Sequence, residues 1–200
     1  RLSYKAQRRN WYMVIDGRRA SMDYDILSDP VFSPDGKRVA YLAIPGFAKP
    51  LRGNFDKYRV VVDGLEGKAY ESAETPVFSP DSKRLAYIVK RGSKSLAVVD
   101  GVEGHAYGAV NSPAFTPDSK HVAYWAAEVS RKSLFGGRTG KWFVVVDGVE
   151  GREKQYDGVF DSSFRRVPDF GFLFDSPKSL HTLALRNKEI FRVEVEIVEE

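Results

Sequence analysis

The stretch Pro30-Val-Phe-Ser-Pro-Asp-Gly-Lys-Arg-Val-Ala-Tyr-Leu-Ala43 decides the fold of this chain, because the same pattern occurs three times. It returns as Pro76-Val-Phe-Ser-Pro-Asp-Ser-Lys-Arg-Leu-Ala-Tyr-Ile-Val89 and as Pro113-Ala-Phe-Thr-Pro-Asp-Ser-Lys-His-Val-Ala-Tyr-Trp-Ala126, and a degenerate copy runs from Phe172 to Leu185. Each full copy has a short apolar piece, then a tight-turn sequence in which proline presets φ and aspartate can bond its own backbone. A run rich in β-forming residues follows. Each copy is therefore predicted to be a β-hairpin.

The last position of this turn differs between the copies. It is Gly36 in the first full copy, Ser82 in the second and Ser119 in the third. Because serine rarely adopts positive φ, we expect that the turn does not require positive φ there.

A second repeated signal lies between the copies of the first. It is an apolar strand that ends in Asp-Gly, a strong signal for a hairpin turn. The four copies are Trp11–Gly17, Tyr58–Gly64, Ser95–Gly101 and Trp142–Gly148. Three of them continue as Leu65-Glu-Gly67, Val102-Glu-Gly104 and Val149-Glu-Gly151, and a tyrosine-bearing strand follows near Tyr24, Tyr70, Tyr107 and Tyr156.

The spacing of the repeats predicts the fold class. Successive Asp-Gly aspartates lie 47, 37 and 47 residues apart. Periods of about 40–50 residues with four short strands per unit are typical of propeller blades. We predict an all-β single domain over 1–200, a β-propeller of four-stranded antiparallel blades. Five blades are recognisable, at about 1–27, 30–73, 76–110, 113–160 and 171–200.

Each predicted blade has a first strand at the apolar piece, a second after the turn, a third before Asp-Gly and a fourth at the later tyrosine. The second strands carry Tyr4, Tyr41, Tyr87, Tyr124 and, by a looser match, Leu183. The fifth copy of the third strand is predicted at 190–197, with alternating apolar and charged residues. The first and last blades are incomplete, so we expect a segment upstream of Arg1 to close the ring, or a larger ring.

The segment Phe32-Ser-Pro-Asp-Gly-Lys-Arg-Val-Ala-Tyr41, followed by an apolar strand, resembles the WD-repeat-like β-propeller repeat of the TolB-like family. The likeness covers nearly the whole chain. It implies a propeller fold and a periplasmic or other extracytoplasmic location, and such repeats occur in scaffolds, periplasmic proteins and accessory domains of peptidases. The last blade departs from the pattern, because Phe174-Asp-Ser-Pro177 lacks the Asp-Gly turn.

Composition excludes several classes of function. The chain has no cysteine, so it can form no disulfide, thiol nucleophile or cysteine metal site. No apolar run approaches the roughly 20 residues of a transmembrane helix, and no signal peptide is visible. The formal net charge is only +4, with Lys and Arg spread along the chain, so we expect no nucleic-acid partner.

No catalytic, cofactor or metal site is predicted. An aspartate that recurs in every repeat is expected to be architectural, because one site rarely needs a copy per blade. His105, His121 and His181 are dispersed and without an HExxH pattern, and the first two are expected to be surface substitutions. No nucleophile elbow is present, and the glycine-rich 136–140 lies in an insertion rather than before a helix. We expect that the chain is not an enzyme.

The best functional signal is the loss of symmetry between repeats. The connection from the second to the third strand is long in two blades, at 44–57 and 127–141, and both connections should project from the same face. Aromatic and cationic side chains of the kind found in binding hot spots occur there and in the connection near 161–169. The candidate binding residues are Phe47, Lys49, Arg52, Phe55, Arg131, Lys132, Phe135, Arg138, Arg165 and Arg166. Alternatively, the insertions are neutral, or their phenylalanines cap the blade ends.

These observations favour a non-enzymatic binding or scaffold module that engages a protein or peptide through the insertion face. Two other interpretations stay open. The chain could be an accessory, gating propeller of a larger hydrolase or peptidase, or it could bind a sugar or peptide in its central channel.

Overall fold

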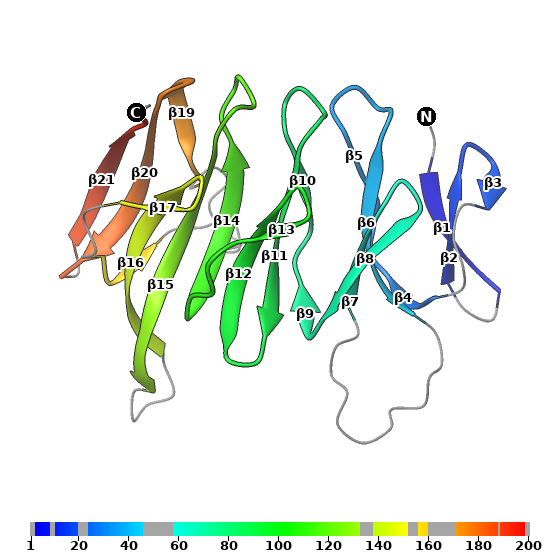
Figure 1. Ribbon diagram of the computed structural model, residues 1–200, viewed down its shortest axis with the longest axis horizontal. Coiled ribbons are helices and arrows are strands. Elements are labelled where there is room, and N and C mark those ends of the chain that lie inside the picture. Colours follow the sequence, from blue (N-terminus) through cyan, green and yellow to red (C-terminus); the bar gives the residue numbers. More distant parts are fainter. Residues whose placement is uncertain are drawn as a thin grey trace. The chain divides into compact units, whose positions relative to one another are not determined.

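The computed structural model describes residues 3–8, 11–19, 24–45, 58–132, 138–151, 156–159, 171–187 and 189–198. These residues form strands, turns and bends, and none of them is helical. All paired strands are antiparallel (Figure 1). The predicted all-β class is therefore confirmed for the described part of the chain.

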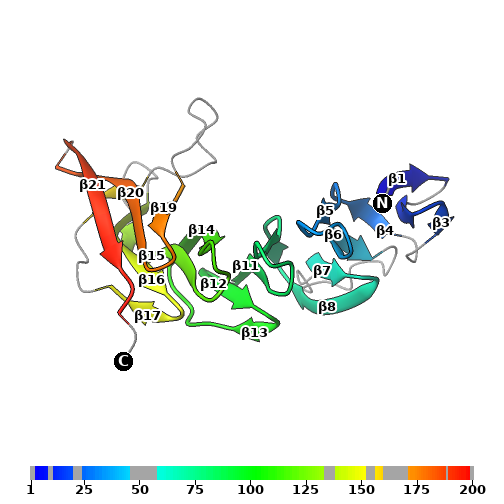
Figure 2. The ribbon, with the colours of Figure 1, turned by 90° about the horizontal axis from the view of Figure 1, so that it is seen from above.

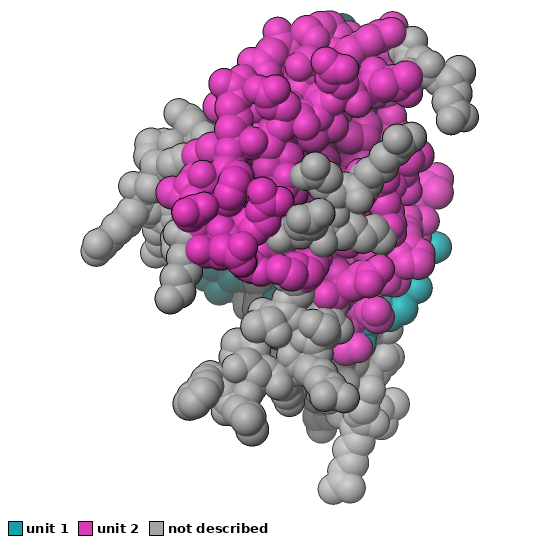
Figure 3. Space-filling view, turned by 90° about the vertical axis from the view of Figure 1, so that its left-hand side faces the viewer, with its two compact units in different colours: residues 1–92, 98–101 teal, residues 93–97, 102–200 magenta. Residues whose placement is uncertain are grey.

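The chain divides into two compact units, which are coloured separately in Figure 3. Unit 1 contains residues 1–92 and 98–101, and unit 2 contains 93–97 and 102–200. The border between them passes through one strand, Lys94–Val99.

The first sheet has eight strands, because one strand joins two predicted blades. Its order is β1-β2-β4-β6-β7-β8, with β3 beside β2 and β5 beside β6. β4 pairs with β2 through Trp11 and Tyr24, and with β6 through Leu27 and Ala43. The strands are β1 (Ser3–Gln7), β2 (Trp11–Ile15), β3 (Arg18–Arg19), β4 (Tyr24–Leu27), β5 (Val31–Phe32), β6 (Val39–Pro45), β7 (Tyr58–Val62) and β8 (Leu65–Tyr70).

Three further sheets follow along the chain. The second contains β9 (Ser72–Ala73), β10 (Val77–Phe78), β11 (Leu85–Arg91), β12 (Lys94–Val99) and β13 (Val102–Glu103). The third contains β14 (Ala109–Phe115), β15 (Val122–Lys132), β16 (Arg138–Val146) and β17 (Val149–Glu150). The fourth contains β18 (Gly158–Val159), β19 (Leu173–Ser176), β20 (Ser179–Arg186) and β21 (Glu189–Glu196).

The chain crosses from one sheet to the next directly after Tyr70, Tyr107 and Tyr156. Tyr70 pairs with Tyr58 of its own sheet, and Ser72–Ala73 already pairs with β11 of the next. Tyr107 likewise pairs with Ser95, and Ala109 pairs with Ala127. The strand that ends at Tyr70 has six residues, whereas Tyr107 and Tyr156 each form a single bridge before the chain enters the following sheet.

Each unit has its own buried core. In unit 1, Met13, Tyr24, Tyr41, Ala43 and Val61 form one cluster. The edges of the Tyr24 and Tyr41 rings meet at a centroid distance of 6.4 Å. The hydroxyl groups of these two tyrosines bring polar atoms into the core.

In unit 2, the third and fourth sheets lie side by side (Figure 2), and their side chains form a shared core. Trp125 of β15 stacks on Phe172 with ring centroids 5.9 Å apart, and meets Tyr156 edge-on at 5.8 Å. Leu180 and Ala184 of β20 are fully buried in the same cluster. The two sheets therefore pack through the aromatic rings of Trp125, Tyr156 and Phe172 together with small and aliphatic side chains.

The strand register corrects one predicted equivalence. Phe174 pairs with Leu180, as Phe78 pairs with Leu85 in the second sheet. Counting two residues onward places Thr182, and not Leu183, at the position of Tyr87. The looser sequence match was wrong because the degenerate copy has a shorter turn than the others.

The turns explain the repeated motifs, with one correction. Both residues of each Asp-Gly turn have positive φ, for example Asp63 at 51° and Gly64 at 85°, as a two-residue type I′ hairpin requires. In the proline-containing turn, φ is 68° at Gly36, 67° at Ser82 and 66° at Ser119. Our expectation that this turn needs no positive φ was wrong.

The reason lies in the hydrogen bonds of the turn. The Ser82 N–H donates to the Ser79 carbonyl at 2.9 Å, and the next two N–H groups return to the Asp81 and Ser79 side chains. These bonds fix the chain reversal, so any residue at the fourth position must take the left-handed conformation.

The last strand shows the predicted alternation of apolar and charged residues. In β21, Phe191, Val193 and Val195 are buried or half-buried, and Arg192 and Glu194 are exposed. Among the described residues, β21 pairs with β20 alone.

Candidate functional site

Most of the predicted binding residues lie outside the described residues. They are Phe47, Lys49, Arg52, Phe55, Phe135, Arg165 and Arg166. For Arg131, Lys132 and Arg138 the main chain alone is described. It places the first two in β15 and the third in β16, and it pairs Lys132 with Arg138.

The second predicted insertion is mostly a ribbon rather than a loop. β15 and β16 stay paired from Ala123 and Val146 out to Lys132 and Arg138, with a register shift after Val129. They have 11 and 9 residues, whereas β11 and β12 have 7 and 6. We name the segments 127–132 and 138–142 the β15–β16 ribbon.

The base of this ribbon is fixed by an ion pair. Lys141 Nζ lies 2.5 Å from Asp157 Oδ1, and Asp157 Oδ2 accepts the Asn187 N–H at 2.8 Å. The bond from Lys141, helped by that from Asn187, lowers the pKa of Asp157. The ribbon is thus held at its base to the end of β20.

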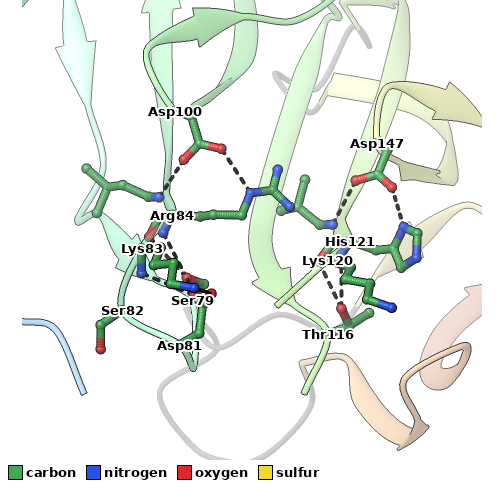
Figure 4. A network of polar contacts seen from close by, with 12 residues as sticks. Ser79, Asp81, Ser82, Lys83, Arg84, Asp100, Thr116, Lys120, His121 and Asp147 are labelled. Carbon is green, nitrogen blue, oxygen red and sulfur yellow. Dashed lines mark hydrogen bonds and ion pairs between the residues drawn. The ribbon is translucent and has the colours of Figure 1, made fainter. Parts of the chain in front are cut away.

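A repeated polar contact, which we name the clasp, connects each proline-containing turn to an Asp-Gly turn. Figure 4 shows two of the three copies among the described residues. In the second copy, Asp100 accepts the Leu85 N–H at 2.9 Å through Oδ1, and pairs with Arg84 Nε at 2.9 Å through Oδ2. Asp63 makes the same two bonds to Val39 and Arg38, at 2.9 and 3.0 Å. The clasp therefore holds the beginning of each second strand.

The third copy contains histidine. Asp147 accepts the Val122 N–H at 2.9 Å, and its other oxygen lies 2.6 Å from His121 Nδ1. Our expectation that His121 is a surface substitution was wrong in this respect: the side chain is only 14% exposed and is bound to Asp147.

The aspartates of the proline-containing turns also accept hydrogen bonds within their own turns. The Ser33 hydroxyl donates to Asp35 Oδ1 at 2.6 Å, and this oxygen accepts the Lys37 N–H at 3.0 Å. These two bonds lower the pKa of Asp35, and a Thr116 hydroxyl bond lowers that of Asp118. The carboxylates hold turns, which agrees with the architectural role that their repetition predicts.

A second link between repeats was missed by the sequence reasoning. The Tyr24 hydroxyl donates to Glu66 Oε1 at 2.9 Å, and Tyr107 bonds to Glu150 in the same way. Burial and this bond raise the pKa of both tyrosines. The recurrence of tyrosine and of Glu-Gly could have signalled the link, but nothing in a linear pattern indicates that the two meet.

The glycine of each Glu-Gly pair is explained by crowding. A Cβ at Gly67 would lie 3.0 Å from the Val60 carbonyl oxygen, and one at Gly151 would lie 3.0 Å from that of Val144. A larger residue there would require the neighbouring backbone to shift by a few tenths of an ångström.

The described residues bear on two further questions, metal binding and membrane crossing. No three His, Asp or Glu side chains among the described residues are grouped so that they could hold a metal ion. The same residues include no helix of the length and apolar character that crossing a membrane requires.

Several solved structures have a fold similar to that of this chain. A structure described as a eukaryotic initiation factor is similar over 95% of this chain and 48% of that chain, with 13% identity and a TM-score of 0.50. A putative TolB from Agrobacterium tumefaciens is 14% identical over 92% of this chain and 65% of its own, with a TM-score of 0.43. The β-propeller domain of the Trilobed protease from Pyrococcus furiosus is 14% identical, over 84% of this chain and 70% of that one, with a TM-score of 0.36.

No family model matches the chain, and no curated protein matches it in sequence. The chain spans about half of the first of these structures. At 13% identity the likeness describes the fold alone. The described fold is an all-β chain of several antiparallel sheets, and one of these similar structures is described as a β-propeller domain.

Proposed function

We propose that this chain is a TolB-like β-propeller module that acts by binding a protein or peptide and not by catalysis. Its partner contacts the long connections between second and third strands. The β15–β16 ribbon is the single observation that supports this most. It is the longest ribbon among the described strands, and its base is pinned by Lys141 and Asp157.

The chemistry of the ribbon favours an acidic partner. Lys132 and Arg138 occupy paired positions, and Arg131 is adjacent in sequence. Like charges at paired positions on a two-stranded ribbon are unfavourable for folding by themselves. A carboxylate-bearing peptide would offset that repulsion, and arginine is enriched in binding hot spots.

A peptide array followed by titration of its best peptide tests the proposal. Lys132→Ala combined with Arg138→Ala should weaken binding at least about tenfold, as expected for hot-spot residues. The matched control is Lys37→Ala with Lys83→Ala, which removes the same charge from the exposed turns and should leave affinity unchanged. Equal loss in both variants would indicate a non-specific charge effect.

The other long connection is tested separately. Arg52→Ala with Phe55→Ala reports on residues 46–57, in unit 1. If both ribbon and connection variants keep full affinity, the insertion face is not the binding surface, and the central channel becomes the better candidate.

We also propose that the sheets are blades of a propeller with five blades in this chain, the eight-stranded sheet supplying two. The repeat count along the sequence supports this number. An experimental structure of the full-length protein tests it, and a count other than five within residues 1–200 would refute it.

A further inference from the structure

Two buried polar atoms of unit 2 have no hydrogen-bond partner in the part of the chain that the structure describes. They are Trp125 Nε1 of β15 and Thr182 Oγ1 of β20, and each of these residues is only 1% exposed. Buried polar groups in folded proteins almost always have a partner, which is either another protein group or an ordered water molecule. The indole N–H and the threonine hydroxyl therefore require an explanation.

Both atoms belong to the core that the third and fourth sheets share. Trp125 is a member of this core. Thr182 alternates with Leu180 and Ala184 on the buried side of β20, and both of these neighbours are members of the same core. Thr182 also pairs with Val193 of β21, which is another member. The indole N–H and the hydroxyl thus enter one apolar cluster from two different sheets.

The second and third sheets each place a tyrosine hydroxyl beside a Glu-Gly glycine. A Cβ on Gly67 would lie 3.9 Å from the Tyr87 hydroxyl oxygen, and a Cβ on Gly104 would lie 3.7 Å from that of Tyr124. Both tyrosines belong to the second strand of their sheets. A buried polar atom therefore recurs at this place in the repeat.

The fourth sheet has a shorter side chain at the same position of its second strand. Thr182 stands where the other sheets have tyrosine, and it lacks the length of a phenol ring. Among the described residues, a Cβ on Gly151 would meet only backbone atoms of Val144 within 4 Å. The hydroxyl of the fourth sheet thus stops short of the place that the tyrosine hydroxyl takes in the preceding two sheets.

We propose that an internal water molecule binds between Trp125 Nε1 and Thr182 Oγ1, in the place of the missing tyrosine hydroxyl. Indole nitrogen can only donate a hydrogen bond, whereas a hydroxyl can both donate and accept. The water oxygen accepts the indole N–H, and a water hydrogen is donated to the threonine oxygen. A buried water needs two to four polar partners, and these two atoms supply the minimum. The bridge links the third and fourth sheets.

Water–protein NOE measurements on the full, ¹⁵N-labelled chain test the site directly. The indole N–H of Trp125 should show an NOE to water, with the sign that marks a long-lived bound molecule. Trp125→Phe identifies the signal, because the variant lacks that one indole resonance. If the Trp125 indole shows no NOE to bound water, the proposal is wrong.

Thr182→Val tests the same site through stability, because valine keeps the shape and removes the hydroxyl. The melting temperature should fall by about 2–4 °C, as for the loss of one hydrogen bond in a chain of this size. A hydroxyl without a bound water predicts the opposite sign, because its removal eliminates an unpaired buried group. A Thr182→Val chain that is as stable as the wild type, or more stable, would overturn the proposal.

Thr116→Val is the matched control for a buried threonine whose bonds are known. Thr116 Oγ1 donates to Asp118 at 2.6 Å and accepts the His121 N–H at 3.0 Å, and the residue is fully buried. Its replacement should lower the melting temperature at least as much as Thr182→Val. The NOE measurement uses the unmodified chain, so it decides the proposal even if a variant does not fold.

Discussion

Ser82 holds a conformation that glycine adopts in the equivalent turn of the preceding repeat. Its φ is 67°, its side chain is almost fully buried, and its hydroxyl accepts the Asp35 N–H at 3.0 Å. The hydroxyl thus connects two successive proline-containing turns within unit 1. This bond offsets the strain of a left-handed serine.

Two substitutions at Ser82 separate the strain from the hydrogen bond. Ser82→Ala removes the bond and keeps the strain, and Ser82→Gly removes both. We expect the alanine variant to be less stable than the glycine variant by about 1 kcal/mol, the difference between alanine and glycine in the left-handed region. Chemical denaturation measures it, and equal stability would show that the strain is relieved elsewhere.

Gly151 supports a prediction about crowding. A Cβ there would lie 3.0 Å from a backbone oxygen, which cannot move aside as a flexible side chain can. Gly151→Ala should lower the free energy of unfolding by about 1–3 kcal/mol, as for other overpacked sites. Gly171→Ala is the matched control, because a Cβ at Gly171 meets nothing within 4 Å. A control as unstable as the Gly151 variant would contradict the argument.

Single residues were predictable from the sequence where their partners are local. The Ser-Pro-Asp turn bonds reach two or five residues along the chain, so the turn could be inferred from the motif. The clasp partners lie 25, 16 and 26 residues apart, and no pattern indicates which cation meets which aspartate. His121 was therefore misjudged, and its alignment with Arg38 and Arg84 was the one available clue.

At the scale of elements, a small side chain on the fourth sheet is matched by a large side chain on the third sheet. The fourth sheet has Thr182 where the others have a buried tyrosine, and the third sheet has Trp125 where the second has Ile88. Thr182 is buried between Leu180 and Ala184, which belong to the same core as Trp125. The large side chain on one sheet thus compensates for the small one on the other.

A double-mutant cycle tests this compensation. Thr182→Tyr alone should overpack the core and cost about 1–3 kcal/mol, and Trp125→Ile alone should leave a cavity and cost about 2–5 kcal/mol. The double variant should lose less than the sum, with a coupling of about 0.5–3 kcal/mol. Additive losses would show that the two positions do not share space.

Hairpins were the elements that the sequence predicted best. Proline-containing and Asp-Gly turns have strong local signals, and the alternation in β21 identifies its buried face. The β15–β16 ribbon was predicted as a loop because its outer part contains Gly140 and several charged residues, which are poor strand formers. The outer residues of the ribbon pair because the strand register at its base continues outward. Composition alone does not reveal that register.

At the scale of the whole molecule, the all-β class followed from the repeats, and the number of blades stays a prediction. The repeats in the sequence give the number of similar units, whereas the hydrogen bonds between strands determine how those strands are grouped into sheets. The eight-stranded sheet illustrates the difference, because β4 bonds to strands of two repeats.

The turn carboxylates predict a collective response to acid. The pKa values of Asp35, Asp118 and Asp157 are all lowered, so their stabilising contribution is present above about pH 4, the usual aspartate value, and is lost as the pH falls through the lower folded values. The melting temperature should therefore fall below about pH 4. Asp35→Asn with Asp118→Asn should flatten this dependence, and a melting temperature that is constant from pH 5 to 3 would contradict it.

The crossing of the chain after Tyr70, Tyr107 and Tyr156 places the borders between sheets within a few residues of the ends of the predicted repeats. A cut between Tyr70 and Ser72 would fall at the bend at Glu71, between β8 of the first sheet and β9 of the second. A cut in the exposed turn at Pro80 would leave both neighbouring pairings intact. Circular permutation should therefore be tolerated at the exposed proline turns, and the new ends of such a chain would lie inside a sheet rather than between two sheets.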